Sequence, residues 1–456
     1  MSLWTSGEIA AATGGSASGD FTVTGVAFDS REVGTGDLFV ALTGEATDGH
    51  RFVDQAFDQG AAGAIVSQPI AQPHVLVADT AAALDALGRA ARARSVATII
   101  GVTGSVGKTS AKEALYAALD RGVPGKVHRS VKSYNNHVGV PLSLARMPRD
   151  ARFAVFEMGM NHAGELAALT RLVRPHLALV TTIAPVHMEF FADESAIADA
   201  KAEIFEGLEP RGIAIVPYDS AHRDRLATAA RASGATVVTF GLGQEADVRA
   251  LEVMRLQTGG SYLTTRVGER ELSFTLSQPG AHWVANALAV LAAVDAAGAD
   301  LGLAGLALGE LGGLAGRGAR FMARVPGGEA LIIDESYNAS PVAMRATLKV
   351  LAEERGRRVA ILGDMLELGS ASPAYHAGLA EPILAARVDT VLLVGEAMRV
   401  LAEALEGKTN VVHAADAAAA LDRLDTVVTA GDAVLVKGSN GIGLSRVIAR
   451  LMGGKT

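Results

Sequence analysis

Residues 101–110 (GVTGSVGKTS) combine glycines with a lysine, a threonine and a serine in the pattern of a phosphate-binding loop. Glycines let the backbone come close to phosphate oxygens, Lys108 can reach the β- and γ-phosphates, and the Thr109 hydroxyl can bind Mg²⁺. An apolar run precedes the loop and a helix-forming stretch follows it, so the loop ends at a helix N-terminus that favours an anion. A glycine turn that only packs a helix against a sheet is the alternative. The Gly-Lys-Thr triplet in this context favours a nucleoside triphosphate.

The loop is a variant of the usual pattern, because Val102 stands where a glycine is common and the glycines are Gly101 and Gly104 instead. Such variants help to identify families. The residues expected to surround the phosphates are Gly104, Ser105, Val106, Gly107, Lys108, Thr109 and Ser110.

Three candidate metal-binding or catalytic residues lie beyond the loop. Glu157 ends an apolar run, and a carboxylate at the carboxyl end of a parallel strand can hold Mg²⁺. A helix-capping acid is an equally good interpretation of Glu157. His187 follows the next apolar run, at the same expected sheet edge, although a lone histidine is more often structural. Lys201 lies on a predicted helix beside Glu203, where a solvated lysine is the ordinary interpretation.

Three asparagines stand out by their surroundings. Asn286 lies inside an otherwise apolar helical stretch, so its amide must find partners, either in a structural hydrogen bond or at the edge of a base. Asn135 and Asn136 form a polar turn that leads into a helix, where capping the helix is the alternative to binding a substrate.

Composition limits the class of protein. The chain has 456 residues, 49% hydrophobic and 20% charged, which predicts a globular protein of about three domains. A net charge of −8 argues against a nucleic-acid surface. The absence of cysteine excludes disulfides and thiolate zinc sites and is typical of a reducing compartment. With no signal-like N-terminus and no apolar run of membrane-spanning length, we expect a cytoplasmic protein without membrane insertion.

The elements expected to position these residues divide the chain into three α/β units, 1–95, 96–315 and 316–456. Strands alternating with helices in the second unit predict a parallel sheet, followed by an antiparallel flap over 248–276. The third unit is typical of an open doubly wound, Rossmann-like sheet, whose ligands bind at the carboxyl ends of the strands. The strands expected in the second unit are 96–101, 153–157, 177–183 and 212–216, and those in the third are 330–334, 359–363, 390–395 and 433–438.

Taken in order, these motifs resemble the Mur ligases over essentially the whole chain. Those enzymes use ATP to form the amide bonds of the peptidoglycan peptide. Residues 334–341 (DESYNASP) and 363–369 (GDMLELG) are similar to the members that add D-alanyl-D-alanine to UDP-N-acetylmuramoyl-tripeptide. Ser340 departs from the pattern, because asparagine is commoner at that position.

The resemblance implies a central ATP-binding domain, an N-terminal domain for the UDP end of the substrate and a C-terminal ligase domain. It implies catalytic roles for Lys108, Lys201 and His187, with Thr109 and Glu157 on one Mg²⁺ and His187 on a second. Lys201 would be the lysine that can be carbamylated into a metal ligand. The remaining ATP contacts would be Asn286, Arg317, Asp334 and Tyr337, and the substrate contacts Ser30, Arg31, Thr43, Asp48, His50, Asn135, Asn136 and Asn338.

The implied reaction converts the tripeptide carboxylate to an acyl phosphate, which the dipeptide amine then attacks. We expect the protein to be a monomer. Three alternatives stay open at this point. The first is another amide ligase of the family, which would add either a different amino acid to the same kind of substrate or glutamate to folate. An ATP-driven switch would use the loop without forming a bond. A dehydrogenase is disfavoured, because no Gly-x-Gly-x-x-Gly follows a strand in the third unit.

Overall fold

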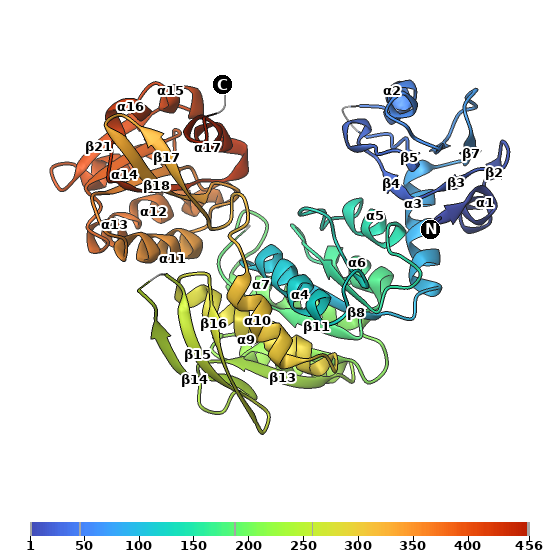
Figure 1. Cartoon of the computed structure of the whole chain (residues 1–456), viewed down its shortest axis with the longest axis horizontal. Helices are drawn as coiled ribbons and strands as arrows, with labels where there is room; N and C mark the ends of the chain where they lie inside the picture. The colour runs from blue at the N-terminus through green and yellow to red at the C-terminus, as the bar shows by residue number, and fades with distance from the viewer. Residues whose placement is uncertain (1, 45–46, 187, 258, 454–456) are drawn as a thin grey trace.

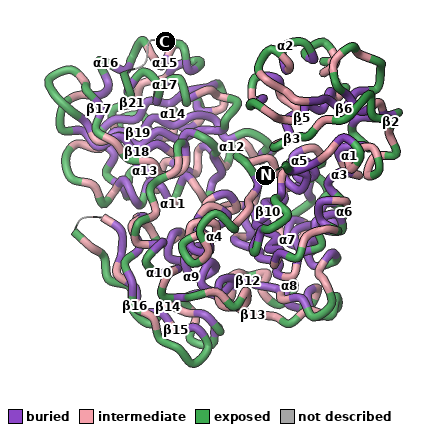
Figure 2. Tube along the Cα trace, turned by 45° about the vertical axis from the view of Figure 1, so that its right-hand side comes forward, coloured by how far each residue is buried: buried purple, intermediate pink, exposed green. Residues whose placement is uncertain are grey.

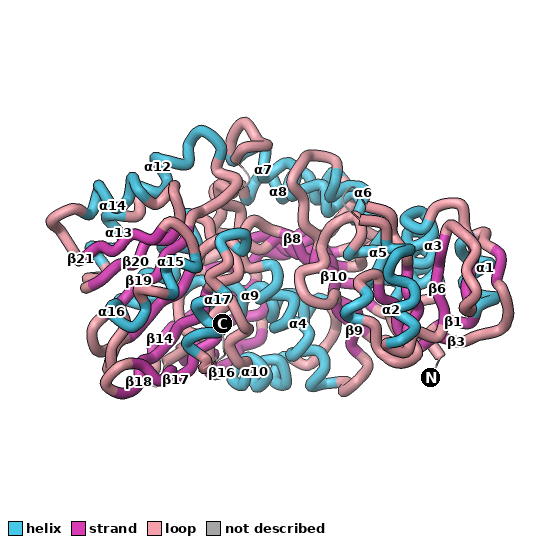
Figure 3. Tube along the Cα trace, turned by 90° about the horizontal axis from the view of Figure 1, so that it is seen from above, coloured by secondary structure: helices cyan, strands magenta, loops and turns pink. Residues whose placement is uncertain are grey.

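The computed structural model describes residues 2–44, 47–186, 188–257 and 259–453. Three α/β bodies follow one another along the chain, the N-terminal and C-terminal ones on either side of the central one (Figure 1). Seen from above, they form an elongated row with the central body in the middle (Figure 3). No helix in the described ranges is both long enough and apolar enough to cross a membrane. The predicted three-domain α/β fold is confirmed.

The central body contains a nine-stranded sheet in the order β16-β15-β14-β13-β12-β11-β8-β10-β9. The strands from β9 to β14 are parallel to their neighbours, and β14, β15 and β16 continue the sheet as an antiparallel flap. The strands are β8 (Thr98–Thr103), β9 (Val127–Arg129), β10 (Phe153–Glu157), β11 (Leu177–Val180), β12 (Ile213–Pro217), β13 (Thr236–Gly241), β14 (Val248–Arg255), β15 (Ser261–Val267) and β16 (Arg270–Leu276).

Both faces of this sheet are covered by helices, because successive side chains of a strand point to opposite faces. On β8, Ile100 packs with one set of helices and Ile99 with the other. Figure 2 shows the resulting buried core of the central strands and the more exposed flap. The first set is α4 (Lys108–Gly122), α9 (Ala281–Ala296) and α10 (Leu301–Glu310), and the second is α5 (Gly139–Ala145), α6 (Glu165–Val173), α7 (Glu194–Ala202) and α8 (Arg223–Ala232).

The C-terminal body has a six-stranded sheet in the order β17-β18-β22-β19-β20-β21. Val359 and Ala360, neighbours on β19, belong to cores on opposite faces, so this sheet is doubly wound as predicted. Strand β17 is antiparallel to β18 and forms one edge. The strands are β17 (Ala319–Val325), β18 (Gly328–Glu335), β19 (Arg358–Gly363), β20 (Thr390–Val394), β21 (Asn410–Ala414) and β22 (Ala433–Lys437). The helices are α11 (Pro341–Ala352), α12 (Ser372–Ala377), α13 (Ala380–Ala385), α14 (Arg399–Leu405), α15 (Ala417–Leu421), α16 (Leu424–Val427) and α17 (Ser445–Leu451).

The N-terminal body has a five-stranded sheet in the order β2-β7-β6-β5-β4, a two-stranded sheet of β1 and β3, and, in its described residues, three α-helices. Its helix α3 packs on α5 of the central body, and the indole Nε1 of Trp4 donates to the carbonyl oxygen of Ala145 at 2.9 Å. The elements are β1 (Trp4–Thr5), α1 (Ser6–Thr13), β2 (Ser16–Ala17), β3 (Thr22–Val23), β4 (Gly25–Ala27), β5 (Asp37–Val40), α2 (Val53–Asp58), β6 (Gly63–Val66), β7 (His74–Leu76) and α3 (Thr80–Ala93).

Every strand expected in the second and third units is present, with ends shifted by up to three residues, and the antiparallel flap is confirmed. Within the described part of these two units, four further strands were not expected: β9, β13, β17 and β21. The boundaries predicted at 95 and 315 fall in the loops after α3 and α10 and stay predictions.

Candidate active site

The phosphate loop connects β8 to α4, the arrangement that the sequence predicts. Two glycines give the loop its shape. Gly104 has a φ of 145°, and a Cβ there would lie 2.0 Å from Thr181 Oγ1. Gly107, with a φ of 89°, precedes the first residue of α4 in the left-handed region that favours glycine. The backbone N–H groups at the start of α4 therefore remain open to an anion.

Lys108, the first residue of α4, folds back over the loop. Its Nζ donates a hydrogen bond to the carbonyl oxygen of Gly104 at 2.7 Å. Burial lowers the pKa of Lys108, the nearby charge of Arg317 lowers it further, and Glu157 opposes both. The ammonium is therefore held where negative phosphate oxygens would relieve the cost of its burial.

Glu157, at the end of β10, is 1% exposed and has a different partner on each oxygen. Thr109 Oγ1 donates to Oε2 at 2.9 Å, and Asn135 Nδ2 donates to Oε1 at 2.8 Å. Two oxygens bound to one Mg²⁺ at about 2.1 Å, in neighbouring octahedral positions, lie about 3 Å apart. The hydroxyl of Thr109 and the carboxylate of Glu157 therefore fit a single Mg²⁺ whose other ligands are phosphate and water.

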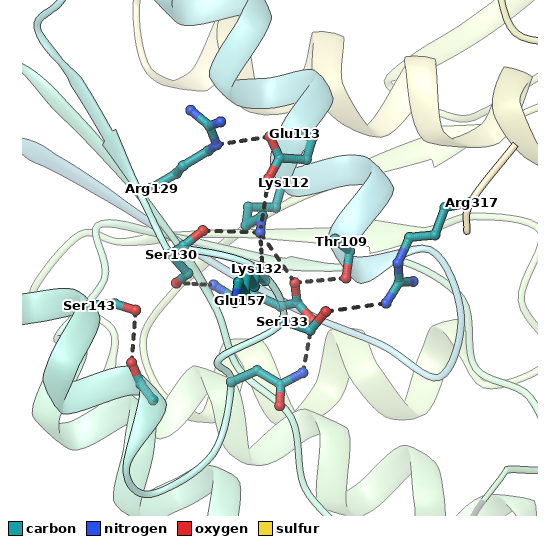
Figure 4. A network of polar contacts seen from close by, with 12 residues as sticks. Thr109, Lys112, Glu113, Arg129, Ser130, Lys132, Ser133, Ser143, Glu157 and Arg317 are labelled. Atoms are coloured by element: carbon teal, nitrogen blue, oxygen red, sulfur yellow. Dashed lines mark hydrogen bonds and ion pairs between the residues drawn. The ribbon is translucent and has the colours of Figure 1, made fainter. Parts of the chain in front are cut away.

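Behind this pair lies a network around Lys112, which the sequence interpretation missed (Figure 4). The Lys112 side chain is fully buried, and Nζ donates to the carbonyl oxygens of Ser130, at 3.0 Å, and Lys132. The same nitrogen lies 3.0 Å from Glu113 Oε1 and 3.8 Å from Glu157 Oε2. Lys112 is one helical turn beyond Lys108, so the i, i+4 spacing was the available signal.

A cavity of about 490 Å³ lies between the central and C-terminal bodies and brings most predicted site residues together. The phosphate loop and Glu157 form one wall, and residues after β18 and β22 form the opposite wall. The predicted residues that line it are Ser105, Val106, Gly107, Lys108, Thr109, Ser110, Asn135, Glu157, Asn286, Arg317, Tyr337 and Asn338. Its wall also contains four charged or titratable residues that were not predicted, namely His282, Glu335, Glu367 and Lys437.

Arg317 joins the two walls of this cavity. Its guanidinium lies over the ring of Tyr337, with Cζ 4.2 Å from the ring centre, and Nη2 contacts Ser133 Oγ at 3.4 Å.

The Asp334 side chain bonds to the protein itself. Its carboxylate accepts hydrogen bonds from the N–H of Gly316, at 2.7 Å, and from the hydroxyl of Ser336, at 2.7 Å. Asp334 therefore holds the turn before β17 in place and is 4% exposed, and its predicted ATP contact stays a prediction.

Lys201 is not the solvated lysine that its helical position favoured, because its side chain is 1% exposed. Burial lowers the pKa of Lys201 well below its ordinary value, and the charge of Lys108 acts in the same direction. The described residues contain no cluster of three or more His, Cys, Asp or Glu side chains arranged for a metal. His187, the predicted ligand of a second Mg²⁺, lies outside the described residues.

The asparagines separate into two kinds. Asn286 is buried on α9 directly beside the loop, and a Cβ on Gly107 would lie 3.0 Å from its Oδ1. Asn136 instead accepts hydrogen bonds from the N–H groups of Val138, at 3.3 Å, and Gly139, at 3.0 Å, where α5 begins. Asn136 therefore has the capping contacts that were the alternative interpretation, and its predicted substrate contact stays a prediction.

In the N-terminal body, Thr43, Asp48 and His50 form one hydrogen-bonded cluster. Asp48 Oδ1 accepts from the N–H of His50 at 3.0 Å and lies 2.6 Å from its Nδ1, and Thr43 Oγ1 lies at 3.4 Å. These bonds with His50 lower the pKa of Asp48. The N–H of Ser67, which was not predicted, donates to His50 Nε2 at 2.9 Å.

The two other predicted contacts for the UDP end have partners of their own. Ser30 Oγ donates to Gln55 Oε1 at 3.0 Å. Arg31 makes a bidentate pair with Asp29, and its side chain is 81% exposed. The assignment of these five residues to the UDP end stays a prediction.

The phosphate loop, the Thr109–Glu157 pair and the facing C-terminal sheet define a Mur ligase. Family models described as the Mur ligase family catalytic domain, the Mur ligase middle domain and the Mur ligase glutamate ligase domain match residues 22–125, 102–294 and 320–440. The chain belongs to the Mur ligase family.

Among known proteins, the chain is similar to the UDP-N-acetylmuramoyl-tripeptide--D-alanyl-D-alanine ligases. The Escherichia coli (strain K12) enzyme of that name is 36% identical over 437 residues, which cover 95% of this chain and 94% of that protein. MurF from Acinetobacter baumannii has a TM-score of 0.85 and 31% identity, with 99% of each chain covered. MurF ligase from Thermotoga maritima in complex with ADP has a TM-score of 0.77 and 26% identity, covering 94% of this chain and 97% of that chain.

Proposed function

We propose that this chain is an ATP-dependent ligase that joins UDP-N-acetylmuramoyl-tripeptide to D-alanyl-D-alanine through an acyl phosphate, releasing ADP and phosphate. The observation that carries the proposal is the cavity in which a phosphate loop on one wall faces a set of polar groups, including Glu335, Asn338 and Lys437, on the other. The names of the similar proteins supply the substrates. We place the enzyme in the cytoplasm and treat it as a monomer.

In this proposal residues from both walls of the cavity bind ATP. The loop amides and Lys108 hold the phosphates of ATP and neutralise charge that develops on the transferred phosphoryl group. Mg²⁺ held by Thr109 and Glu157 supplies further charge stabilisation when it is bound. Asn286 lies beside the loop for the adenine, and Arg317 and Tyr337 face the nucleotide from the other domain.

Lys201 fits the role of a carbamylated lysine, because carbamylation requires a neutral amine. The amine attacks CO₂ through its lone pair and loses a proton, which leaves a negatively charged carbamate. Burial lowers the pKa of Lys201 and thereby favours the neutral form. A carbamate there would add an oxygen ligand for a second Mg²⁺, with His187 as its proposed partner.

The test is ADP release measured with each substrate omitted in turn. We expect rapid ADP release only when ATP, a UDP-N-acetylmuramoyl-tripeptide and D-alanyl-D-alanine are all present. Repeating the assay with single amino acids as the amine tests the other amide ligases of the family. A rate of ADP release that does not depend on the dipeptide would indicate an ATP-driven switch instead.

Substrate binding is expected to bring the C-terminal body closer to the central one. Water would hydrolyse an acyl phosphate, so the cavity must exclude solvent during the reaction. Small-angle X-ray scattering should give a smaller radius of gyration with ATP analogue, Mg²⁺ and tripeptide substrate than without ligands. Superimposable profiles in the two states would contradict this closure.

A further inference from the structure

Glu335 and Lys437 form an ion pair in the cavity wall that faces the phosphate loop. They are register partners at the carboxyl ends of the parallel strands β18 and β22. Lys437 Nζ lies 3.4 Å from Glu335 Oε2 and donates to the carbonyl oxygen of Asn338 at 2.9 Å. The side chains of Lys437 and Glu335 are 3% and 16% exposed. Both side chains are therefore largely excluded from solvent, and Glu335 is the more accessible of the two.

Only one oxygen of Glu335 faces Lys437. Within the described ranges no residue makes a hydrogen bond to Oε1, which lies on the side of Gly318 and Trp283 Nε1. Gln278 Oε1 lies near the same point and is a buried acceptor that has no partner among the described residues. Two acceptor oxygens, Gln278 Oε1 and Glu335 Oε1, and one donor, the indole N–H of Trp283, thus lie within 4 Å of the position that a Cβ on Gly318 would take. An ammonium group, which offers three donors and no acceptor, has the matching chemistry.

Burial makes Glu335 a better base than an ordinary glutamate, although the two cations beside it oppose the effect. Burial raises the pKa of Glu335 and Asp334 acts in the same direction, whereas Lys437 and Arg317 lower it. Burial lowers the pKa of His282, on the neighbouring helix α9, to about 4, so this imidazole is neutral at pH 7. Glu335 thus combines a carboxylate oxygen that accepts no hydrogen bond from the described residues with a proton affinity raised by burial.

Building on the proposed function, we propose that Glu335 binds the ammonium group of the incoming dipeptide and accepts one of its protons. The resulting neutral amine attacks the acyl carbon, forming the C–N bond as the C–O bond to phosphate breaks. The leaving phosphate takes the electron pair of that bond and the second amine proton. Glu335 then returns its proton to solvent, and Lys437 holds the carboxylate in position throughout.

Hydroxylamine separates this role from the first half of the reaction. It is largely uncharged at neutral pH and converts an acyl phosphate to a hydroxamate without a protein base. The experiment measures hydroxamate formation from ATP, tripeptide substrate and hydroxylamine, and amide formation with D-alanyl-D-alanine, for the wild type, Glu335→Gln and Glu335→Asp. Glu396→Gln, at an exposed ion pair with Arg399 of the same domain, is the matched control.

For Glu335→Gln we expect kcat/KM for the dipeptide at pH 7 to fall about 100-fold, within the range for loss of a general base. Hydroxamate formation should stay within threefold of the wild type. The loss should shrink to about tenfold at pH 9, because an α-amino group with a pKa near 8 is then largely neutral. Glu335→Asp should recover part of the rate.

Two results would overturn the role of Glu335. An equal fall in hydroxamate and amide formation would mean that the pair only maintains the wall, and unchanged dipeptide kinetics would mean that the amine binds elsewhere. Failure of the proposed function looks different, because the wild type itself would then form neither hydroxamate nor amide.

Discussion

Replacing Lys108 with alanine is expected to lower ADP formation by about 10³-fold or more while the fold is preserved. Removing one preorganised donor from a developing negative charge costs about 10²–10³ in rate, and this donor also carries a full charge. Among the described residues, Lys108 Nζ donates only to carbonyl oxygens of its own loop, at 2.7 Å to Gly104 and 3.5 Å to Ser105. Its loss should therefore leave the neighbouring core unchanged.

The measurement is steady-state ADP release with all substrates, together with circular dichroism and thermal melting. Lys408→Ala, which removes an exposed lysine from the C-terminal body, is the control for a change of one charge. Calorimetry with ADP and Mg²⁺ should show weakened binding in Lys108→Ala and unchanged binding in Lys408→Ala. Near-normal ADP release by a folded Lys108→Ala enzyme would remove Lys108 from its assigned role.

The parts of the fold that sequence patterns predicted well are strands buried on both faces. β10 and β20 are buried at all five positions, and four successive residues of each are apolar. The unexpected strands give weaker signals. β9 has three half-buried residues, and β17 alternates exposed and partly buried residues at a sheet edge. Such short or half-exposed segments acquire their pairing from the neighbouring strand.

The site residues, like the strands, include some that the sequence predicts and some that it does not. Lys108, Thr109 and Glu157 were predictable because a loop motif and the end of a strand fix where their side chains lie. Glu335 belongs to the 334–341 motif and Lys437 to the predicted strand 433–438, but their pairing was not predictable because it depends on the register of β18 and β22, which are far apart in sequence. The burial of Lys201 was equally hidden, because a single helix does not show what packs against it.

Lys112→Met is expected to destabilise the central body and weaken nucleotide binding together. The substitution keeps the bulk of the side chain but leaves two carbonyl oxygens, Glu113 and Glu157 without the ammonium between them. Removing one partner from a buried charged group costs about 3–5 kcal/mol. At about 2–4 °C per kcal/mol for a domain of this size, the melting temperature should fall by about 10 °C.

The nucleotide effect follows from Glu157, whose carboxylate is set between Lys112, Thr109 and Asn135. Without Lys112 the segment 130–132 loses its anchor on α4, so we expect the affinity for ADP with Mg²⁺ to fall about tenfold. The loss should be smaller when Mg²⁺ is replaced by EDTA, because the change acts through the carboxylate that holds the metal. Calorimetry of the two conditions measures this difference directly.

Lys126→Met is the matched control for the Lys112 variant. Lys126 pairs with Asp150 at the surface, where both side chains are about half exposed, and such pairs contribute about 0–1 kcal/mol. Its melting temperature and nucleotide affinity should stay close to those of the wild type. If Lys112→Met also melted and bound nucleotide like the wild type, the network of Figure 4 would not support the metal-binding carboxylate. Glu157 would then be positioned by Thr109 and Asn135 alone.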